Sequence, residues 1–234
     1  QQVSHFLYGY VNSEINYSVV DWLFKLEKTL IDIELKKKIP ILVGGSGLYI
    51  NAVINGLVNI PVISQKIKND SLSRFNDVGI EKFRQINFKI DPSFVQNNYD
   101  KHRLLRAYSI FLETKKNISF WHKQPRVKSV NKNIYSFFIK SERKLIYKKC
   151  EIRFDNMLAK GAVEEVKKLH YLNIDRSLPI SKSLGVKWLL NYLDNKISFE
   201  EAVILSKRDT RRYVKRQFTW FNHNYIPYKT LILE

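Results

Sequence analysis

The stretch Ile39-Pro-Ile-Leu-Val-Gly-Gly-Ser-Gly-Leu-Tyr49 decides the fold class of this 234-residue chain. Residues 39–43 are continuously apolar, which is typical of a strand covered on both faces within a parallel sheet. A glycine-rich turn at residues 44–47 follows directly, and residues 48–57 have the apolar pattern of a helix. A buried strand, a glycine turn and a helix in this order predict an α/β architecture.

The residues before this stretch support the same fold class. Residues 19–37 carry apolar side chains at helical spacing, and Ser18 with Asp21 has the form of a capping box at the start of that helix. We therefore expect a helix that leads into the buried strand.

The remaining sequence divides into a helical stretch and a second α/β part. Residues 61–125 show helical patterns without a clear strand, so we predict a helical insertion there between the core segments 1–60 and 126–234. Inside the insertion, Asp100 is expected to cap a helix that runs to Lys116. Further elements are expected in the second core segment: helices at 141–159, 162–172, 185–193 and 199–222, the last capped by Ser198 with Glu201, and strands at 134–139 and 229–233.

The composition favours a polyanionic partner. Forty Lys and Arg residues against 22 Asp and Glu residues give a formal net charge of +18 at pH 7, a field that attracts nucleic acids and phosphate-bearing ligands. No apolar run approaches the roughly 20 residues that cross a bilayer. The single Cys150 excludes an intramolecular disulfide, so a reducing, cytoplasmic location is expected.

The glycine-rich turn is a candidate ligand site. Gly44, Gly45 and Gly47 allow a ligand to approach the backbone at the carboxyl end of the predicted strand, where α/β proteins usually bind. The Ser46 hydroxyl would face that crevice as a hydrogen-bond donor or acceptor. A tight strand-to-helix turn without a ligand explains the same glycines equally well. The spacing matches neither a Walker A loop nor a dinucleotide fingerprint.

A run of basic residues forms a second candidate site. Arg208, Arg211, Arg212, Lys215 and Arg216 recur at helical spacing, so they share one side of the predicted helix 199–222, and we call them the basic face. A solvated charged surface is the usual explanation of such a run. Four arginines with a single acid, Asp209, exceed what solubility requires, so contact with phosphate groups is favoured.

Two smaller basic clusters are weaker candidates. One lies at residues 102–106, near the start of its predicted helix, where an ordinary charged surface is the favoured explanation. The other consists of Lys182 and Lys187, which flank Gly185.

Arg153 lies on the predicted helix 141–159 between the apolar residues Ile152 and Phe154. A guanidinium beside such neighbours can be partly desolvated, and its bidentate pairing with phosphate is then strong. A salt bridge to Asp or Glu is the alternative, and the spacing alone favours it. The five histidines show no H-x-x-H or H-E-x-x-H spacing, so no metal site built from protein side chains is expected.

The order of these motifs resembles the tRNA dimethylallyltransferases, also called isopentenyl-tRNA transferases. Residues 39–49 resemble the family's strand and glycine-threonine turn, and His5 and Tyr17-Ser18 with Asp21 fit the segment before it. The later motifs that fit in order are His102-Arg-Leu-Leu-Arg-Ala107, Arg153-Phe-Asp-Asn-Met-Leu158 with Gly161, Leu178-Pro179 with Gly185, and Thr210-Arg211 with Lys215-Arg-Gln-Phe-Thr-Trp220. The resemblance covers nearly the whole chain, and six ordered motifs are specific where any single one is not.

The resemblance implies a P-loop-kinase-like core with a parallel sheet and a mostly helical insertion that contacts tRNA. It implies transfer of a dimethylallyl group from dimethylallyl diphosphate to N6 of the adenosine 3′ of the anticodon, position 37 of tRNA, with Mg2+ held together with the diphosphate. The implied partners are the tRNA anticodon stem-loop and dimethylallyl diphosphate, for a monomer without a membrane segment. Such chemistry requires the base to leave its stack.

The resemblance also assigns roles to individual residues. Ser46 stands where the family has a threonine near the reacting amine, and Arg153 stands where the family binds the diphosphate and stabilises the leaving group. The backbone of Gly44, Gly45 and Gly47 is implied to line the substrate pocket. The implied tRNA-contacting residues are His102, Arg103, Leu104, Leu105, Arg106, Lys182, Gly185, Lys187, Arg208, Arg211, Arg212 and Lys215.

Two features depart from the family pattern. The family's P-loop strand and helix, and the aspartate that accepts the proton from the adenine amine, are expected ahead of Gln1, so the chain is expected to be N-terminally truncated. Val186 replaces an aromatic residue beside Gly185. A catalytically inactive RNA-binding fragment of the same enzyme is therefore the alternative function. A nucleotide or nucleoside kinase ranks third, because it needs a Walker A sequence upstream and leaves the basic face unexplained.

Overall fold

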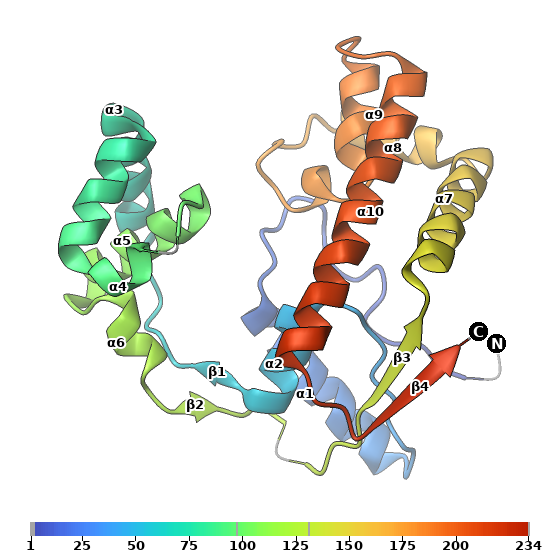
Figure 1. Cartoon of the computed structure of the whole chain (residues 1–234), viewed down its shortest axis with the longest axis horizontal. Helices are drawn as coiled ribbons and strands as arrows, with labels where there is room; N and C mark the ends of the chain where they lie inside the picture. Colours follow the sequence, from blue (N-terminus) through green and yellow to red (C-terminus); the bar gives the residue numbers. More distant parts are fainter. Residues whose placement is uncertain (1–2, 97, 131, 234) are drawn as a thin grey trace. The chain divides into compact units, whose positions relative to one another are not determined.

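The computed structural model describes residues 3–96, 98–130 and 132–233 (Figure 1). They form two compact units: the first joins residues 3–54 with 129–130 and 132–233, and the second comprises residues 55–96 and 98–128. The sequence predicts a helical insertion at residues 61–125, and the second unit begins and ends a few residues outside that range.

The first unit combines helices with a small parallel sheet. In chain order its elements are α1 (Val19–Leu35), α2 (Gly47–Asn55, ending at the unit boundary), β3 (Phe137–Ser141), α7 (Arg143–Ala159), α8 (Ala162–Tyr171), the 3-10 helix η1 (Ile180–Lys182), α9 (Val186–Leu193), α10 (Phe199–Asn224) and β4 (Lys229–Leu233).

Polar caps fix the starts of α1 and α10 as the sequence indicated. Ser18 and Asp21 form a reciprocal capping box at α1, and the Ser198 hydroxyl accepts a 3.1 Å hydrogen bond from the backbone N–H of Glu201 at α10. These bonds satisfy N–H groups that have no partner within the helix. The prediction that Ser141 begins α7 is wrong, because Ser141 is the last residue of β3 and Glu142 occupies the cap position without a side-chain bond.

The parallel sheet is built from the two late predicted strands. β3 and β4 pair in parallel with Phe137 opposite Lys229 and Ser141 opposite Leu233. The predicted strand at residues 39–43 is not formed: Ile39 is 89% and Val43 is 82% exposed, and no strand among the described residues pairs with this segment. A strand needs a neighbour for its backbone hydrogen bonds, and β3 and β4 pair only with each other in this sheet.

Two contacts hold α10 in the centre of the first unit. Near its start, Ala202 packs in an apolar core with Val166 of α8 and with Leu189 and Leu190 of α9. Near its end, the Phe221 ring stacks on Phe138 of β3 with centroids 5.1 Å apart. These contacts attach the helix that carries the basic face to both the small helices and the sheet.

The second unit is helical apart from a short pair of antiparallel strands, which lie near its first and last residues. Its elements are β1 (Leu57–Val58), α3 (Gln65–Ile90), α4 (Pro92–Val95), α5 (Lys101–Thr114), α6 (Ile118–His122) and β2 (Arg126–Val127), with β1 paired to β2. The predicted cap Asp100 accepts a 2.9 Å hydrogen bond from the backbone N–H of Arg103 and so begins α5. The core includes Phe83, Val95 and Leu104.

Candidate functional site

The glycine-rich turn lies against the C-terminal half of α10. The Gln217 side-chain amide donates a 2.7 Å hydrogen bond to the carbonyl oxygen of Gly45. A methyl group on Gly47 would lie 2.2 Å from the Trp220 ring, a distance that real atoms do not adopt. The backbone can therefore approach α10 this closely only because position 47 lacks a side chain. A methyl group on Gly44 would meet nothing within 4 Å.

Ser46 lies at the start of α2. Its carbonyl oxygen accepts a 3.0 Å hydrogen bond from the backbone N–H of Ile50, which is the first bond of that helix. The residue is half-buried, and its hydroxyl forms no hydrogen bond with any residue that the structure describes. The hydroxyl is therefore available to a ligand beside the helix N-terminus, where N–H groups favour negative charge.

Ion pairs connect α10 to α7. The Lys207 ammonium lies 2.6 Å from an Asp155 carboxylate oxygen, and the Arg211 guanidinium forms an ion pair with Glu151. Glu151 and Asp155 are one helical turn apart, so they occupy the side of α7 that faces α10. Arg211 of the predicted basic face is thus already partnered by a carboxylate that the sequence pattern did not indicate.

Arg153 occupies a different side of α7. It is two positions from both Glu151 and Asp155, which places it about half a turn around the helix from them. Its side chain is exposed and forms no ion pair with any described residue. The expectation of partial desolvation is therefore wrong: Phe154 turns inward to pack beside Gly185, and Ile152 is itself 50% exposed. The alternative salt bridge is also not found among the described residues.

The basic face has a paired part and an open part. Arg208 is half-buried, and its guanidinium lies 3.2 Å from Asp209, whereas Arg212 is exposed with a longer 3.7 Å separation from the same carboxylate. Lys215 and Arg216 are exposed. The positive charge that a ligand can reach is therefore concentrated at residues 212–216.

Asp209 stays ionised within this cluster. Burial raises the pKa of its carboxyl, but hydrogen bonds from Trp188 and Arg208 and the charges of Arg208 and Arg212 outweigh burial, so its pKa lies below the usual value. The Trp188 ring N–H donates to it at 2.7 Å. This bond links α9 to α10.

The cluster around Gly185 combines a packing glycine with two exposed lysines. Gly185 is buried with φ of +87°, and a methyl group there would lie 2.8 Å from the Phe154 ring. The left-handed backbone and the close ring both require glycine. Lys182 is exposed, and the Lys187 ammonium lies 4.3 Å from the centre of the Trp188 ring. Gly185 thus positions α9, and the lysines present charge.

Within the second unit, the cluster at residues 102–106 divides between surface and core. His102, Arg103 and Arg106 are exposed, Leu105 is half-buried, and Leu104 is completely buried. In this conformation, the Leu104 side chain cannot contact a ligand, because its surface is used in the core with Phe83 and Val95. Its position in the motif is explained by packing.

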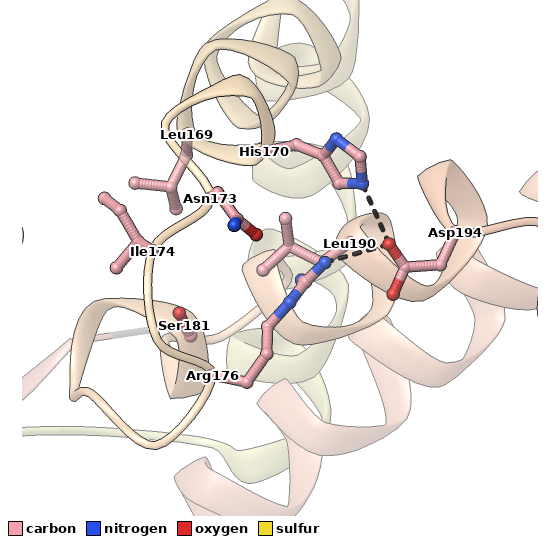
Figure 2. A pocket seen from close by; sticks show the side chains of 8 residues that line it. All are labelled: Leu169, His170, Asn173, Ile174, Arg176, Ser181, Leu190 and Asp194. Carbon is pink, nitrogen blue, oxygen red and sulfur yellow. Dashed lines mark hydrogen bonds and ion pairs between the residues drawn. The ribbon is translucent and has the colours of Figure 1, made fainter.

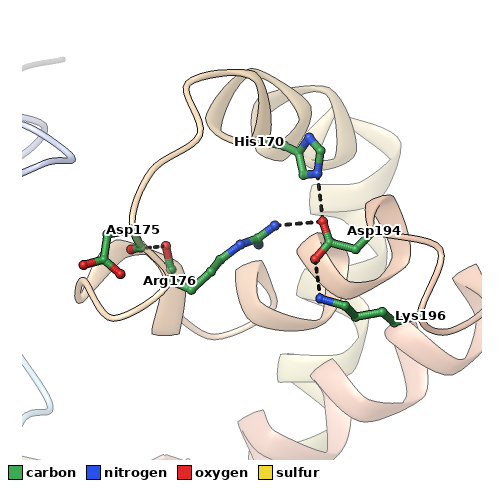
Figure 3. A network of polar contacts seen from close by, with 6 residues as sticks. His170, Asp175, Arg176, Asp194 and Lys196 are labelled. Carbon is green, nitrogen blue, oxygen red and sulfur yellow. Dashed lines mark hydrogen bonds and ion pairs between the residues drawn. The ribbon is translucent and has the colours of Figure 1, made fainter.

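A separate polar pocket lies where α8 and α9 end (Figure 2). Its volume is about 100 Å³. Asp194 accepts hydrogen bonds from His170 at 2.8 Å, Arg176 at 2.9 Å and Lys196 at 2.9 Å (Figure 3). The Lys196 bond is the main cause of a lowered Asp194 pKa; burial opposes it, and His170 and Arg176 reinforce it. The pocket is lined by Leu169, His170, Asn173, Ile174, Arg176, Ser181, Leu190 and Asp194.

Metal-ligating side chains do not gather within the described ranges. There, no group of three or more His, Cys, Asp or Glu residues is placed to hold a metal ion. Across the same residues, no helix has the length and apolar character needed to cross a bilayer.

Sequence reasoning did not assign roles to Gln217, Trp220 or Trp188. Gln217 and Trp220 lie in the quoted motif Lys215–Trp220, and the glycines at 45 and 47 indicated a close approach without showing what approaches. The Asp194 network had no sequence signal, because its partners follow no recognised spacing.

Comparison with known proteins identifies the family. A profile described as IPP transferase matches residues 1–224. A tRNA dimethylallyltransferase of Ehrlichia canis is 37% identical over 226 residues, which cover 95% of this chain and 75% of the relative. One from a Wolbachia of Drosophila simulans is 37% identical over 228 residues, covering 97% and 77%.

Solved structures of transferases from other organisms have a similar fold. The crystal structure of a full-length tRNA isopentenylpyrophosphate transferase from Bacillus halodurans has 28% identity and a TM-score of 0.65, covering 99% of this chain and 72% of that one. A eukaryotic dimethylallyltransferase acting on tRNA, 22% identical, shares the fold with a TM-score of 0.70 over 91% of this chain and 54% of its own. The prediction of an α/β fold of the P-loop-kinase-like kind is confirmed. The chain belongs to the IPP transferase family, the transferases named tRNA dimethylallyltransferases.

Proposed function

We propose that this chain transfers a dimethylallyl group from dimethylallyl diphosphate to N6 of adenosine 37 in the tRNA anticodon stem-loop. The contact between the glycine-rich turn and α10 carries the proposal. This contact joins Ser46, whose hydroxyl has no partner among the described residues, to α10, the helix that bears the open part of the basic face at residues 212–216. Membership in a family of transferases whose relatives are named for this activity supports the same conclusion.

Ser46 and Arg153 are the proposed catalytic residues. The Ser46 hydroxyl and the backbone of Gly44, Gly45 and Gly47 would hold the adenine whose amine attacks the prenyl carbon. As the new nitrogen–carbon bond forms, the carbon–oxygen bond to the diphosphate breaks and the diphosphate leaves with the electron pair. The alkylated nitrogen then releases one of its two protons to water. The exposed Arg153 guanidinium is free to form charge-assisted hydrogen bonds with that leaving group.

The tRNA would be held by the exposed basic residues. On α10, Arg212 and Lys215 are open to phosphate contact, and Arg208 and Arg211 are oriented by Asp209 and Glu151. Arginine suits this role because its planar guanidinium pairs with phosphate in a bidentate manner. Lys182 and Lys187 beside Gly185, and His102, Arg103 and Arg106 with Leu105, are proposed to contribute further contacts, with Leu104 supporting them from the core.

Mg2+ is proposed to accompany the diphosphate. The diphosphate oxygens would supply ligands to the ion, as substrate phosphates usually do where proteins use magnesium. No catalytic step is assigned to the ion. A monomer that acts in the cytoplasm is part of the same proposal.

A transfer assay tests the proposal. The purified chain is incubated with dimethylallyl diphosphate labelled in the prenyl group, Mg2+ and a tRNA transcript that carries adenosine 37. We expect label to enter this tRNA and not a transcript with guanosine 37. Ser46→Ala and Arg153→Ala should each lower the rate about tenfold or more, while Lys149→Ala, an exposed residue on the same helix as Arg153, should not. Binding of tRNA without any transfer would favour the RNA-binding alternative instead.

A further inference from the structure

Tyr99 is a large aromatic side chain at the surface of the second unit. It precedes α5, and it is 66% exposed. The Arg84 guanidinium of α3 lies over its ring, 4.0 Å from the ring centre. One face of the ring is therefore covered by a cation, and the high exposure leaves the remainder of the ring to solvent.

The cation behind the ring is held in place. Arg84 is half-buried, and its guanidinium donates a 3.4 Å hydrogen bond to the carbonyl oxygen of Val95. Its Nε atom is buried without a hydrogen-bond partner among the described residues, so contact with the Tyr99 ring is a principal interaction of the group. A ring fixed in this way loses little conformational freedom when a ligand covers its open face.

The surroundings of Tyr99 are basic. Lys101, His102 and Arg103 follow it and are exposed. The Arg103 guanidinium donates a 3.0 Å hydrogen bond to the side chain of Asn98, the residue before Tyr99. The one acid of this segment, Asp100, is engaged in capping α5. An open aromatic face thus lies among positive charges.

We propose that Tyr99 is a stacking platform for an unpaired RNA base, and that Arg103 and His102 contact the adjoining phosphates. Aromatic faces interleaved with basic residues bind single-stranded nucleic acid, because every base has a π-face and every nucleotide a phosphate. The proposal rests on the proposed function in one respect: the RNA is the unpaired loop of the tRNA anticodon arm.

The test uses the whole chain and an anticodon stem-loop RNA with 2-aminopurine placed in turn at each loop position. Stacking on Tyr99 should quench the fluorescence at one of these positions. Tyr99→Leu should abolish that quenching and weaken RNA affinity about tenfold, whereas Tyr99→Phe should retain both. Tyr171→Leu is the matched control, because Tyr171 is 83% exposed on α8 in the first unit.

The outcomes separate the two proposals. If wild-type protein binds the RNA and Tyr99→Leu binds it as tightly as Tyr171→Leu does, the stacking platform is refuted while tRNA binding stands. If the wild-type protein binds no RNA, both proposals are refuted. Thermal melts of each variant exclude unfolding, and loss of affinity in Tyr99→Leu with an unchanged melt supports the platform.

Discussion

The side-chain amide of Gln217 donates a 2.7 Å hydrogen bond to the carbonyl oxygen of Gly45, across a sequence separation of 172 residues. The bond ties the glycine-rich turn to α10 immediately beside Ser46. Because Trp220 packs on Gly47 one helical turn further along, the turn is fixed at two points. The position of the Ser46 hydroxyl thus depends on residues at the far end of the chain.

Replacing Gln217 by Leu should therefore impair catalysis more than folding. The Gly45 carbonyl would lose its partner, which costs about 1 kcal/mol of unfolding free energy for a half-buried group. Ser46 would move with the turn, and small displacements in a site cost about tenfold or more in rate. Thermal melts and the prenyl-transfer rate measure the two effects. Thr219→Val is the control, because the Thr219 hydroxyl bonds only to a carbonyl of its own helix, and an equal loss of rate in both variants would contradict the account.

Substituting Gly47 by Ala should destabilise the protein, and the same change at Gly44 should not. The added methyl group would collide with the Trp220 ring at position 47 but meets open space at position 44. Overpacking of this kind costs about 1–3 kcal/mol, measurable as the midpoint of denaturant unfolding. Combining Gly47→Ala with Trp220→Leu should recover part of the loss, and a double variant no more stable than the additive sum would contradict the proposed contact.

Arg212→Ala should weaken tRNA binding and lower its salt dependence. Each lost phosphate contact reduces the slope of log affinity against log salt by about one. Lys168→Ala, which removes an equal charge from an exposed position on α8, should leave the slope unchanged. Titrations of each variant with tRNA at several salt concentrations measure this slope. Equal slopes for Arg212→Ala and the wild-type protein would exclude a phosphate contact by Arg212.

The hydrogen bonds and ion pairs of Asp194 should make the stability of the folded state depend on pH in the acidic range. The folded-state pKa of Asp194 lies below its ordinary value of 3.8, so the network stabilises the folded state above that value. The contribution is lost as the pH falls through the folded-state pKa. Asp194→Asn should consequently lower the melting temperature at pH 7, with a gap to the wild-type protein that narrows below about pH 4. A gap of constant size from pH 7 to pH 3 would show that the charge of Asp194 is not involved.

Local sequence signals predicted most helices because their causes are local. Capping side chains such as Ser18 and Asp100 act within one turn of the residues that they cap, so they can be read directly from the sequence. The strands β3 and β4 were also found from their apolar patterns. The segment at residues 39–43 has the same pattern but is exposed, because pairing depends on a neighbouring strand and not on the segment alone.

The geometry of the site is set by long-range contacts, which local sequence patterns do not encode. The glycines at 45 and 47 indicated a close approach, but the identity of the approaching residues, Gln217 and Trp220, is decided by the packing of α10. Likewise, helical spacing grouped Arg211 with Arg212, yet the ion pair with Glu151 separates their environments. Composition and spacing give the charge of a face but not the carboxylates that neighbouring helices bring to it.

The central claim is that the glycine-rich turn and the open part of the basic face, residues 212–216 of α10, serve one ligand site. Arg153, which lies on a different side of α7 from the residues that pair with α10, is proposed to join that site when the diphosphate is bound. The most direct measurement is amide hydrogen exchange of the whole chain, followed by mass spectrometry, with and without tRNA and dimethylallyl diphosphate. We expect slower exchange in residues 44–50, 150–156 and 208–216 together when both substrates are present. When Ser46 and Arg153 are replaced by Ala, the substrates should slow exchange in the first two segments much less than they do in the wild-type protein. Slower exchange along α10 alone, with the other two segments unchanged, would contradict the claim.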